Sequence, residues 1–116
     1  MTENCETKII IETDEYILVS DKSKILYAFF CRNRKRLKLT CIDETFELNG
    51  DERLFFAKLL DNEFIPISGC CCINPLFISE YKINRKEVTM INGTTFHLTN
   101  RFKNILDKYF EINENI

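Results

Sequence analysis

The chain has 116 residues, a length that fits a single domain with one small core. Hydrophobic residues make up 45% of it, with ten phenylalanines and four tyrosines, and charged residues 29%, which excludes a disordered chain. The longest apolar runs, such as residues 25–31 and 67–73, are far shorter than the roughly 20 residues of a membrane-spanning helix, so we expect no membrane partner. A net charge of −2 argues against a chain that binds polyanions over its whole surface.

The amino-terminal segment carries acids where a secretory signal would carry bases, and no apolar run follows it. We therefore expect a cytoplasmic protein. Six cysteines are present, and Cys70, Cys71 and Cys72 are consecutive beside Gly69. Without an export signal, we expect reduced, buried thiols that fill a packed strand or turn rather than a disulfide framework.

Short stretches of β-branched and aromatic residues predict strands along most of the chain. In chain order they are residues 8–12, 16–19, 24–31, 36–42, 45–48, 64–67, 80–83, 86–91 and 94–98. The pair Asn92-Gly93 between the last two predicts a β-hairpin with a type I′ turn, which needs positive φ at both central residues.

Two stretches have apolar residues at helical spacing, over residues 51–60 and 100–110. The first begins at acids, which suit the positive end of a helix dipole, and the side chain of Thr99 or Asn100 can cap the second. Because the strand connections are short, the sequence predicts a mainly β fold of antiparallel sheets with one or two short helices, in one domain over residues 1–116.

Candidate catalytic and metal-binding residues are few. His97 is the only histidine, and a lone histidine in a predicted strand is more often structural than the partner of a catalytic cysteine. Consecutive cysteines of a strand point to opposite faces, and no Cys-x-x-Cys occurs, which argues against a zinc site. Glycine-rich phosphate-binding motifs are also missing. We expect no enzyme activity, metal or cofactor.

Charges are segregated along the chain. Residues 1–16 carry five acids against one lysine, whereas residues 32–38 carry five bases and no acid. The bases of the second segment are Arg32, Arg34, Lys35, Arg36 and Lys38. A tight turn between two strands would project them together, and guanidinium groups bind phosphates and the guanine edge. The alternative interpretation of residues 32–38 is a solvated hairpin connection without a ligand. A second basic group, Arg101 and Lys103, can contribute to binding only if the fold places it near these residues.

Residues 64–74 read Phe-Ile-Pro-Ile-Ser-Gly-Cys-Cys-Cys-Ile-Asn, and a predicted strand, the Asn-Gly hairpin and the stretch Thr-Asn-Arg-Phe-Lys at 99–103 follow without gaps. Over residues 27–110 this order resembles the LytTR family of bacterial DNA-binding domains, which occur mostly as output modules of response regulators. Phe64, Ile73 and Asn74 fit the family's signature of Phe-x-Arg-x-His-x-Ser, an apolar stretch and Asn.

The resemblance implies an elongated assembly of short antiparallel sheets whose loops insert into successive major grooves of DNA. The loop regions at the DNA would be residues 32–36, 68–70 and 100–103. Lys35, Arg36 and Arg101 match contacting positions of the family.

The middle region departs from the family. Pro66, Ser68 and Cys70 stand where the family usually has Arg, His and Ser, and Gly69 stands where a polar contact residue often lies. The Ser68 hydroxyl and the Gly69 amide are left to donate to a phosphate.

The first function hypothesis is a sequence-specific, DNA-binding transcription regulator of the LytTR type. Its expected footprint comprises Arg32, Arg34, Lys35, Arg36, Lys38, Ser68, Gly69, Arg101 and Lys103. Double-stranded DNA is the expected partner, and a homodimer or a separate signalling partner would supply regulation. The alternative is a degenerate LytTR-like module that binds a protein instead of DNA, which the changes at Pro66, Ser68 and Gly69 motivate.

Overall fold

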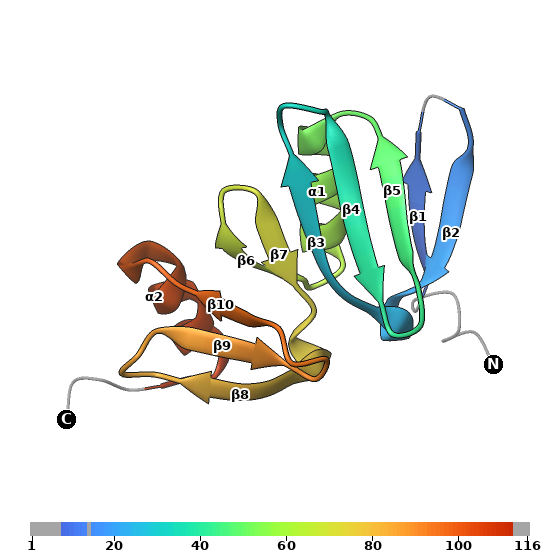
Figure 1. Ribbon diagram of the computed structural model, residues 1–116. Helices are drawn as coiled ribbons and strands as arrows, with labels where there is room; N and C mark the ends of the chain where they lie inside the picture. The colour runs from blue at the N-terminus through green and yellow to red at the C-terminus, as the bar shows by residue number, and fades with distance from the viewer. Residues whose placement is uncertain (1–7, 14, 113–116) are drawn as a thin grey trace.

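Three small antiparallel sheets and two α-helices make up the computed structural model, which describes residues 8–13 and 15–112 (Figure 1). Part of the acidic segment 1–16, residues 1–7 and 14, lies outside the described residues. The molecule is a flattened slab with extents of 50 × 42 × 23 Å. The predicted mainly β fold of short antiparallel sheets is confirmed.

The first sheet is a hairpin of β1 (Lys8–Glu12) and β2 (Ile17–Asp21). The second has the strand order β5-β4-β3-β7-β6, and the third the order β10-β9-β8. The strands of the second sheet are β3 (Ile25–Cys31), β4 (Arg36–Cys41), β5 (Thr45–Asn49), β6 (Ile65–Ser68) and β7 (Cys71–Ile73). Those of the third are β8 (Ile78–Lys82), β9 (Glu87–Met90) and β10 (Thr95–His97).

Two α-helices and two short 3₁₀ helices complete the fold: α1 (Glu52–Asp61), α2 (Asn100–Tyr109), η2 (Lys22–Lys24) and η3 (Pro75–Phe77). The Asp51 side chain accepts a hydrogen bond from the Arg53 amide at 2.8 Å and so caps the start of α1. The expected cap of α2 was wrong, because Thr99 occupies the cap position without a side-chain hydrogen bond.

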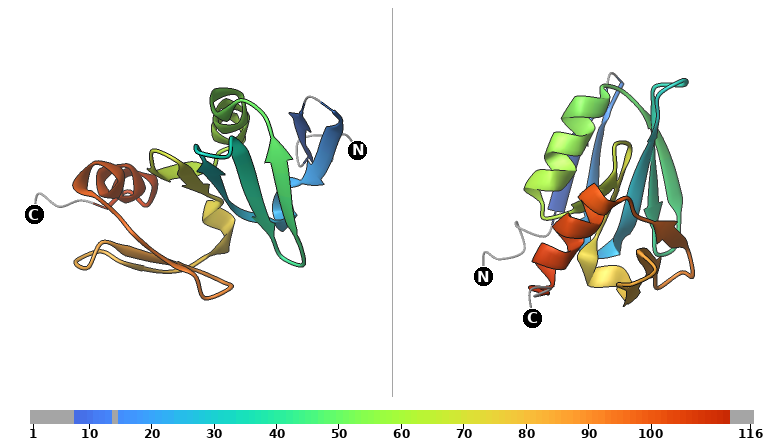
Figure 2. Two further views of the ribbon diagram at one scale, coloured as in Figure 1. Left: turned by 45° about the horizontal axis from the view of Figure 1, so that its top comes forward. Right: turned by 90° about the vertical axis from the view of Figure 1, so that its left-hand side faces the viewer.

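The buried residues form two hydrophobic clusters instead of the single core expected from chain length. The first lies between β1, α1 and one face of the large sheet, and the second between β6, β7, the three-stranded sheet and α2 (Figure 2). Strand β7 serves both, since Cys72 belongs to the first cluster whereas Cys71 and Ile73 belong to the second. Consecutive cysteines therefore face opposite sides of the sheet, as strand geometry predicts.

Most predicted strands are present with ends shifted by one or two residues, but β7 was missed. The hairpin at Asn92-Gly93 is confirmed by the pairing of β9 with β10. Its turn type was wrong: Gly93 alone has positive φ, at 93°. The Gly93 amide donates to the Met90 carbonyl and the Met90 amide to the Thr94 carbonyl, each at 2.9 Å, which makes a three-residue loop with glycine in the left-handed position.

Candidate nucleic-acid interface

The turn between β3 and β4 consists of residues 32–35, all of them exposed, and carries three of the five bases of the basic run. The Lys35 amide donates to the Arg32 carbonyl at 3.3 Å, and Lys35 adopts a left-handed backbone conformation with φ of 53°. The Lys35 carbonyl accepts from the Gly50 amide at 3.4 Å, which ties the turn to the start of α1. The turn therefore presents Arg34 and Lys35 to solvent from a fixed backbone.

Arg36 and Lys38 do not belong to the turn, contrary to the expectation that one tight loop projects all five bases. They alternate along β4 with the buried Leu37 and Leu39 and so lie on the sheet face opposite α1. The Arg36 guanidinium forms an ion pair with Glu47 of β5 at 3.0 Å. Lys38 lies in register with Phe29 on one side and Glu47 on the other.

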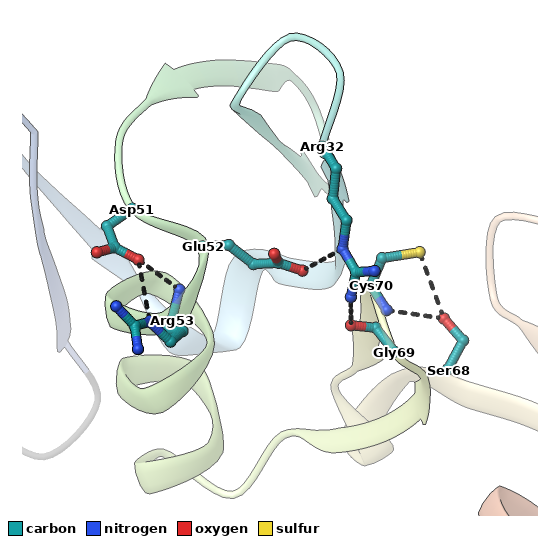
Figure 3. A network of polar contacts seen from close by, with 7 residues as sticks. All are labelled: Arg32, Asp51, Glu52, Arg53, Ser68, Gly69 and Cys70. Atoms are coloured by element: carbon teal, nitrogen blue, oxygen red, sulfur yellow. Dashed lines mark hydrogen bonds and ion pairs between the residues drawn. The ribbon is translucent and has the colours of Figure 1, made fainter.

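Arg32 connects the β3–β4 turn with two other segments (Figure 3). Its Nε donates to the Glu52 carboxylate at 3.1 Å, and its Nη2 donates to the Gly69 carbonyl at 3.2 Å. Glu52 begins α1, and Gly69 lies in the turn between β6 and β7. One side chain thus fixes the relative positions of the basic turn, the start of α1 and the β6–β7 turn.

The β6–β7 turn is built from small residues and offers mainly backbone groups. The Ser68 hydroxyl accepts a hydrogen bond from the Cys70 amide at 3.2 Å and lies 3.6 Å from the Cys70 sulfur. Gly69 is exposed, and a methyl group added there would meet only the Arg32 guanidinium, at 3.5 Å. The turn has room for a larger side chain at position 69, so packing does not require glycine there.

The two predicted bases at the start of α2 have different surroundings. Arg101 is exposed, and its guanidinium carbon lies 5.2 Å from the centre of the Phe102 ring. Lys103 is mostly buried and forms an ion pair at 2.6 Å with Asp107, which also accepts a hydrogen bond from the Tyr81 hydroxyl. Lys103 is therefore engaged within α2 instead of projecting a charge to solvent, and Asp107 links the helix to Tyr81 of β8.

The structure brings together the β3–β4 and β6–β7 turns through Arg32, and both turns project from the same end of the large sheet (Figure 1). Helix α2 packs against β6 and lies on the far side of the β6–β7 turn from the basic turn. Within residues 8–13 and 15–112, four of the predicted cations have no ion pair: Arg34, Lys35, Lys38 and Arg101.

Glu52 is a site residue that sequence reasoning missed. The acidic pair Asp51-Glu52 was interpreted only as a helix start. Nothing in the sequence indicates that the two carboxylates have different roles. Asp51 caps the helix, whereas Glu52 reaches across to Arg32. A shallow depression lined by Arg32, Arg34 and Lys35 includes these two carboxylates, so the surface beside the turn is of mixed charge.

The cysteines near the site differ in accessibility. Burial, followed by the nearby Cys70, raises the pKa of the Cys71 thiol to about 12, and burial likewise raises the pKa of Cys72. Cys31 and Cys70 are half-buried and line one depression beside Arg32. Within the described part of the chain, no cluster of three or more metal-ligating side chains occurs.

Comparison with known proteins adds one structural likeness. No family model matches the chain, and no curated protein matches it. Among solved structures, it is similar to the LytTr DNA-binding domain of a Bacillus cereus protein described as a methyl-accepting/DNA response regulator. The TM-score is 0.67 and the identity 15%, over 90% of this chain and 96% of that domain. The chain therefore has the fold of a LytTR-type domain. None of the helices in the described residues has the length and apolar character needed to cross a membrane.

Proposed function

We propose that the chain is a DNA-binding module of the LytTR type that acts in transcription regulation, with its loops inserted into the major groove. The observation that carries this proposal is the Arg32 bridge, which holds an exposed basic turn beside the β6–β7 turn, on a fold shared with a DNA-binding domain. A DNA partner implies a cytoplasmic protein.

In this proposal three exposed cations without an ion pair neutralise phosphates: Lys35, Lys38 and Arg101. Exposed cations bind phosphate at small desolvation cost, and each contact releases condensed counterions from DNA. Arg36 can exchange Glu47 for a phosphate, because both side chains of that pair are about half exposed.

Sequence reading falls to the β3–β4 turn. Arg34 at its tip can donate two parallel hydrogen bonds to a guanine edge. The β6–β7 turn supplies the Ser68 hydroxyl and the Gly69 amide, which position a phosphate and carry no base information. Arg32 and Lys103 act as positioning residues, since their charges are engaged by Glu52 and Asp107.

A charge-reversal titration tests the proposal. The variant Arg34→Glu/Lys35→Glu/Arg101→Glu changes exposed cations without an ion-pair partner and should retain the fold. Fluorescence anisotropy with a labelled mixed-sequence duplex should show affinity reduced by about 100-fold or more. The matched control Lys58→Glu/Arg85→Glu/Lys108→Glu changes net charge equally at exposed positions outside the footprint and should lose much less.

Equal losses in the two variants would contradict the footprint, because net charge alone would then explain binding. No measurable binding by the wild-type chain to any duplex would overturn DNA binding altogether. The protein-binding alternative, which the uncharged β6–β7 turn favours, would then become the leading hypothesis.

A further inference from the structure

The β1–β2 hairpin has an apolar outer face that nothing in the described structure covers. Alternation buries Ile9 and Ile11 in the first hydrophobic cluster, with Leu18 packed beside them, so the side chains at alternate positions of the two strands point away from it. On that outer face Ile10 is 48%, Ile17 59% and Val19 57% exposed. Ile10 and Val19 lie directly opposite each other across the two strands. Three such side chains together on one small sheet indicate an interaction surface.

Charges of opposite sign flank this face at its two ends. Lys8 lies at one end opposite Asp21, with which it forms a weak ion pair at 3.9 Å that leaves its side chain 51% exposed. Hydrogen bonds from Ser23 lower the pKa of Asp21, burial opposes this shift, and the charges of Lys8 and Lys24 lower the pKa further. The other end carries the exposed Glu12, across from Ile17.

Two copies of this face can pack against each other with the lysine end of one against the glutamate end of the other. Strand β1 reads Lys-Ile-Ile-Ile-Glu, with Ile10 at its centre. When two copies meet face to face about a two-fold axis perpendicular to the strands, the strands run antiparallel, so Lys8 of each copy meets Glu12 of the other. A two-fold axis parallel to the strands would instead place β1 of one copy over β2 of the other, so that Lys8 meets Asp21, which it already contacts within its own chain, and Glu12 meets Ile17 with no cation opposite it.

We propose that the outer face of the β1–β2 hairpin binds a second copy of this chain in that antiparallel arrangement. Ile10, Val19 and Ile17 of the two copies form the apolar centre, and the two Lys8–Glu12 contacts flank it. This interface is distinct from the proposed contacts of α2 and of the β6–β7 turn, because the hairpin lies at the opposite end of the slab from α2 and beyond β5 from the β6–β7 turn (Figures 1 and 2).

The small size of the face limits the expected affinity of the dimer. A hairpin of ten paired residues offers less than the roughly 800 Å² per partner of a standard interface, so the free protein should dimerise weakly, with Kd on the order of 100 μM. Two copies on neighbouring DNA sites would experience a higher effective concentration and associate there.

Sedimentation velocity of the full chain without DNA, from about 10 μM to about 1 mM, tests the interface. Lys8→Glu and Glu12→Lys should each weaken dimerisation at least several-fold, because each places like charges at both contacts. An equimolar mixture of these two variants should dimerise like the wild type, since both contacts then join opposite charges. Arg85→Glu, an equal change of charge in the β8–β9 turn, should have no effect.

Val19→Lys provides a second variant in which the face itself is disrupted, and it should be monomeric at every concentration. Its thermal unfolding and its affinity for a single DNA site should match the wild type, which separates this test from that of DNA binding. Monomeric wild-type protein up to about 1 mM, or a mixture of the charge variants that stays monomeric, would overturn the proposed interface.

Discussion

Asn74 links three segments of the chain although it lies outside every strand and helix. It is fully buried, its Nδ2 donates to the Lys22 and Ile25 carbonyls at 3.0 and 2.9 Å, and its Oδ1 accepts from the Leu76 amide at 3.1 Å. Only a side chain with both a donor and an acceptor group satisfies all three partners. This explains physically why the resemblance includes an asparagine at this position.

Replacing Asn74 with alanine should lower the free energy of unfolding by about 3 kcal/mol, because buried backbone groups lose their partners. Denaturant unfolding followed by circular dichroism measures the change. Asn33→Ala, in the exposed β3–β4 turn, should cost less than about 0.5 kcal/mol. An Asn74→Ala variant as stable as the wild type would contradict the assigned role.

The cysteines should separate by reactivity. The thiolate is the reacting form, so a pKa raised to about 12 keeps Cys71 almost entirely protonated at pH 8, and its labelling should be much slower there than that of an ordinary thiol. Cys41 and Cys72, also buried, should be protected as well. Among the cysteines that the structure describes, brief iodoacetamide treatment with peptide mass spectrometry should label Cys31 and Cys70 first. Uniform labelling of the native protein would contradict this expectation, whereas uniform labelling in guanidinium is the control.

At the scale of elements, the sequence pattern predicted the helices and strands that have strong local signals. It failed for elements whose formation depends on tertiary contacts. Both helices and the Asn92-Gly93 hairpin were predicted because apolar spacing and a turn dipeptide are local. Strand β7 has only three residues, two of them cysteine, so it lacks a propensity signal and forms through its pairing with β3 and β6. The type I′ turn was wrong because hairpin closure, not the dipeptide alone, sets the backbone angles.

The packing of helix α2 includes a buried ion pair that could not be predicted from its sequence. Lys103 and Asp107 are four residues apart, with side chains only 13% and 8% exposed. Asp107→Ala leaves the lysine ammonium without this carboxylate and removes the acceptor for Tyr81, so we expect a loss of about 3 kcal/mol in unfolding free energy.

Guanidinium denaturation measures this loss, and Lys108→Met, an exposed change in the same helix, should have little effect. Faster hydrogen exchange in α2 of the Asp107→Ala variant would accompany it. An unchanged unfolding midpoint would show that the pair does not hold the helix.

At the scale of the whole molecule, the residues of the candidate site come from segments far apart in the chain. The sequence identified the basic run and the start of α2 from charge alone. It could not show that Arg32 reaches Glu52 and Gly69, or that Lys103 is buried, because both depend on how the sheets pack. The sequence shows where basic residues cluster along the chain. The fold determines which of their charges remain available to a ligand.

The salt dependence of DNA binding tests the central claim most directly. If Lys35, Arg36, Lys38 and Arg101 each contact one phosphate, a plot of log association constant against log salt concentration should have a slope of about −3.6. The Arg34→Glu/Lys35→Glu variant should have a shallower slope. A slope near zero for the wild type, or one that the variant leaves unchanged, would contradict a DNA interface at the β3–β4 turn.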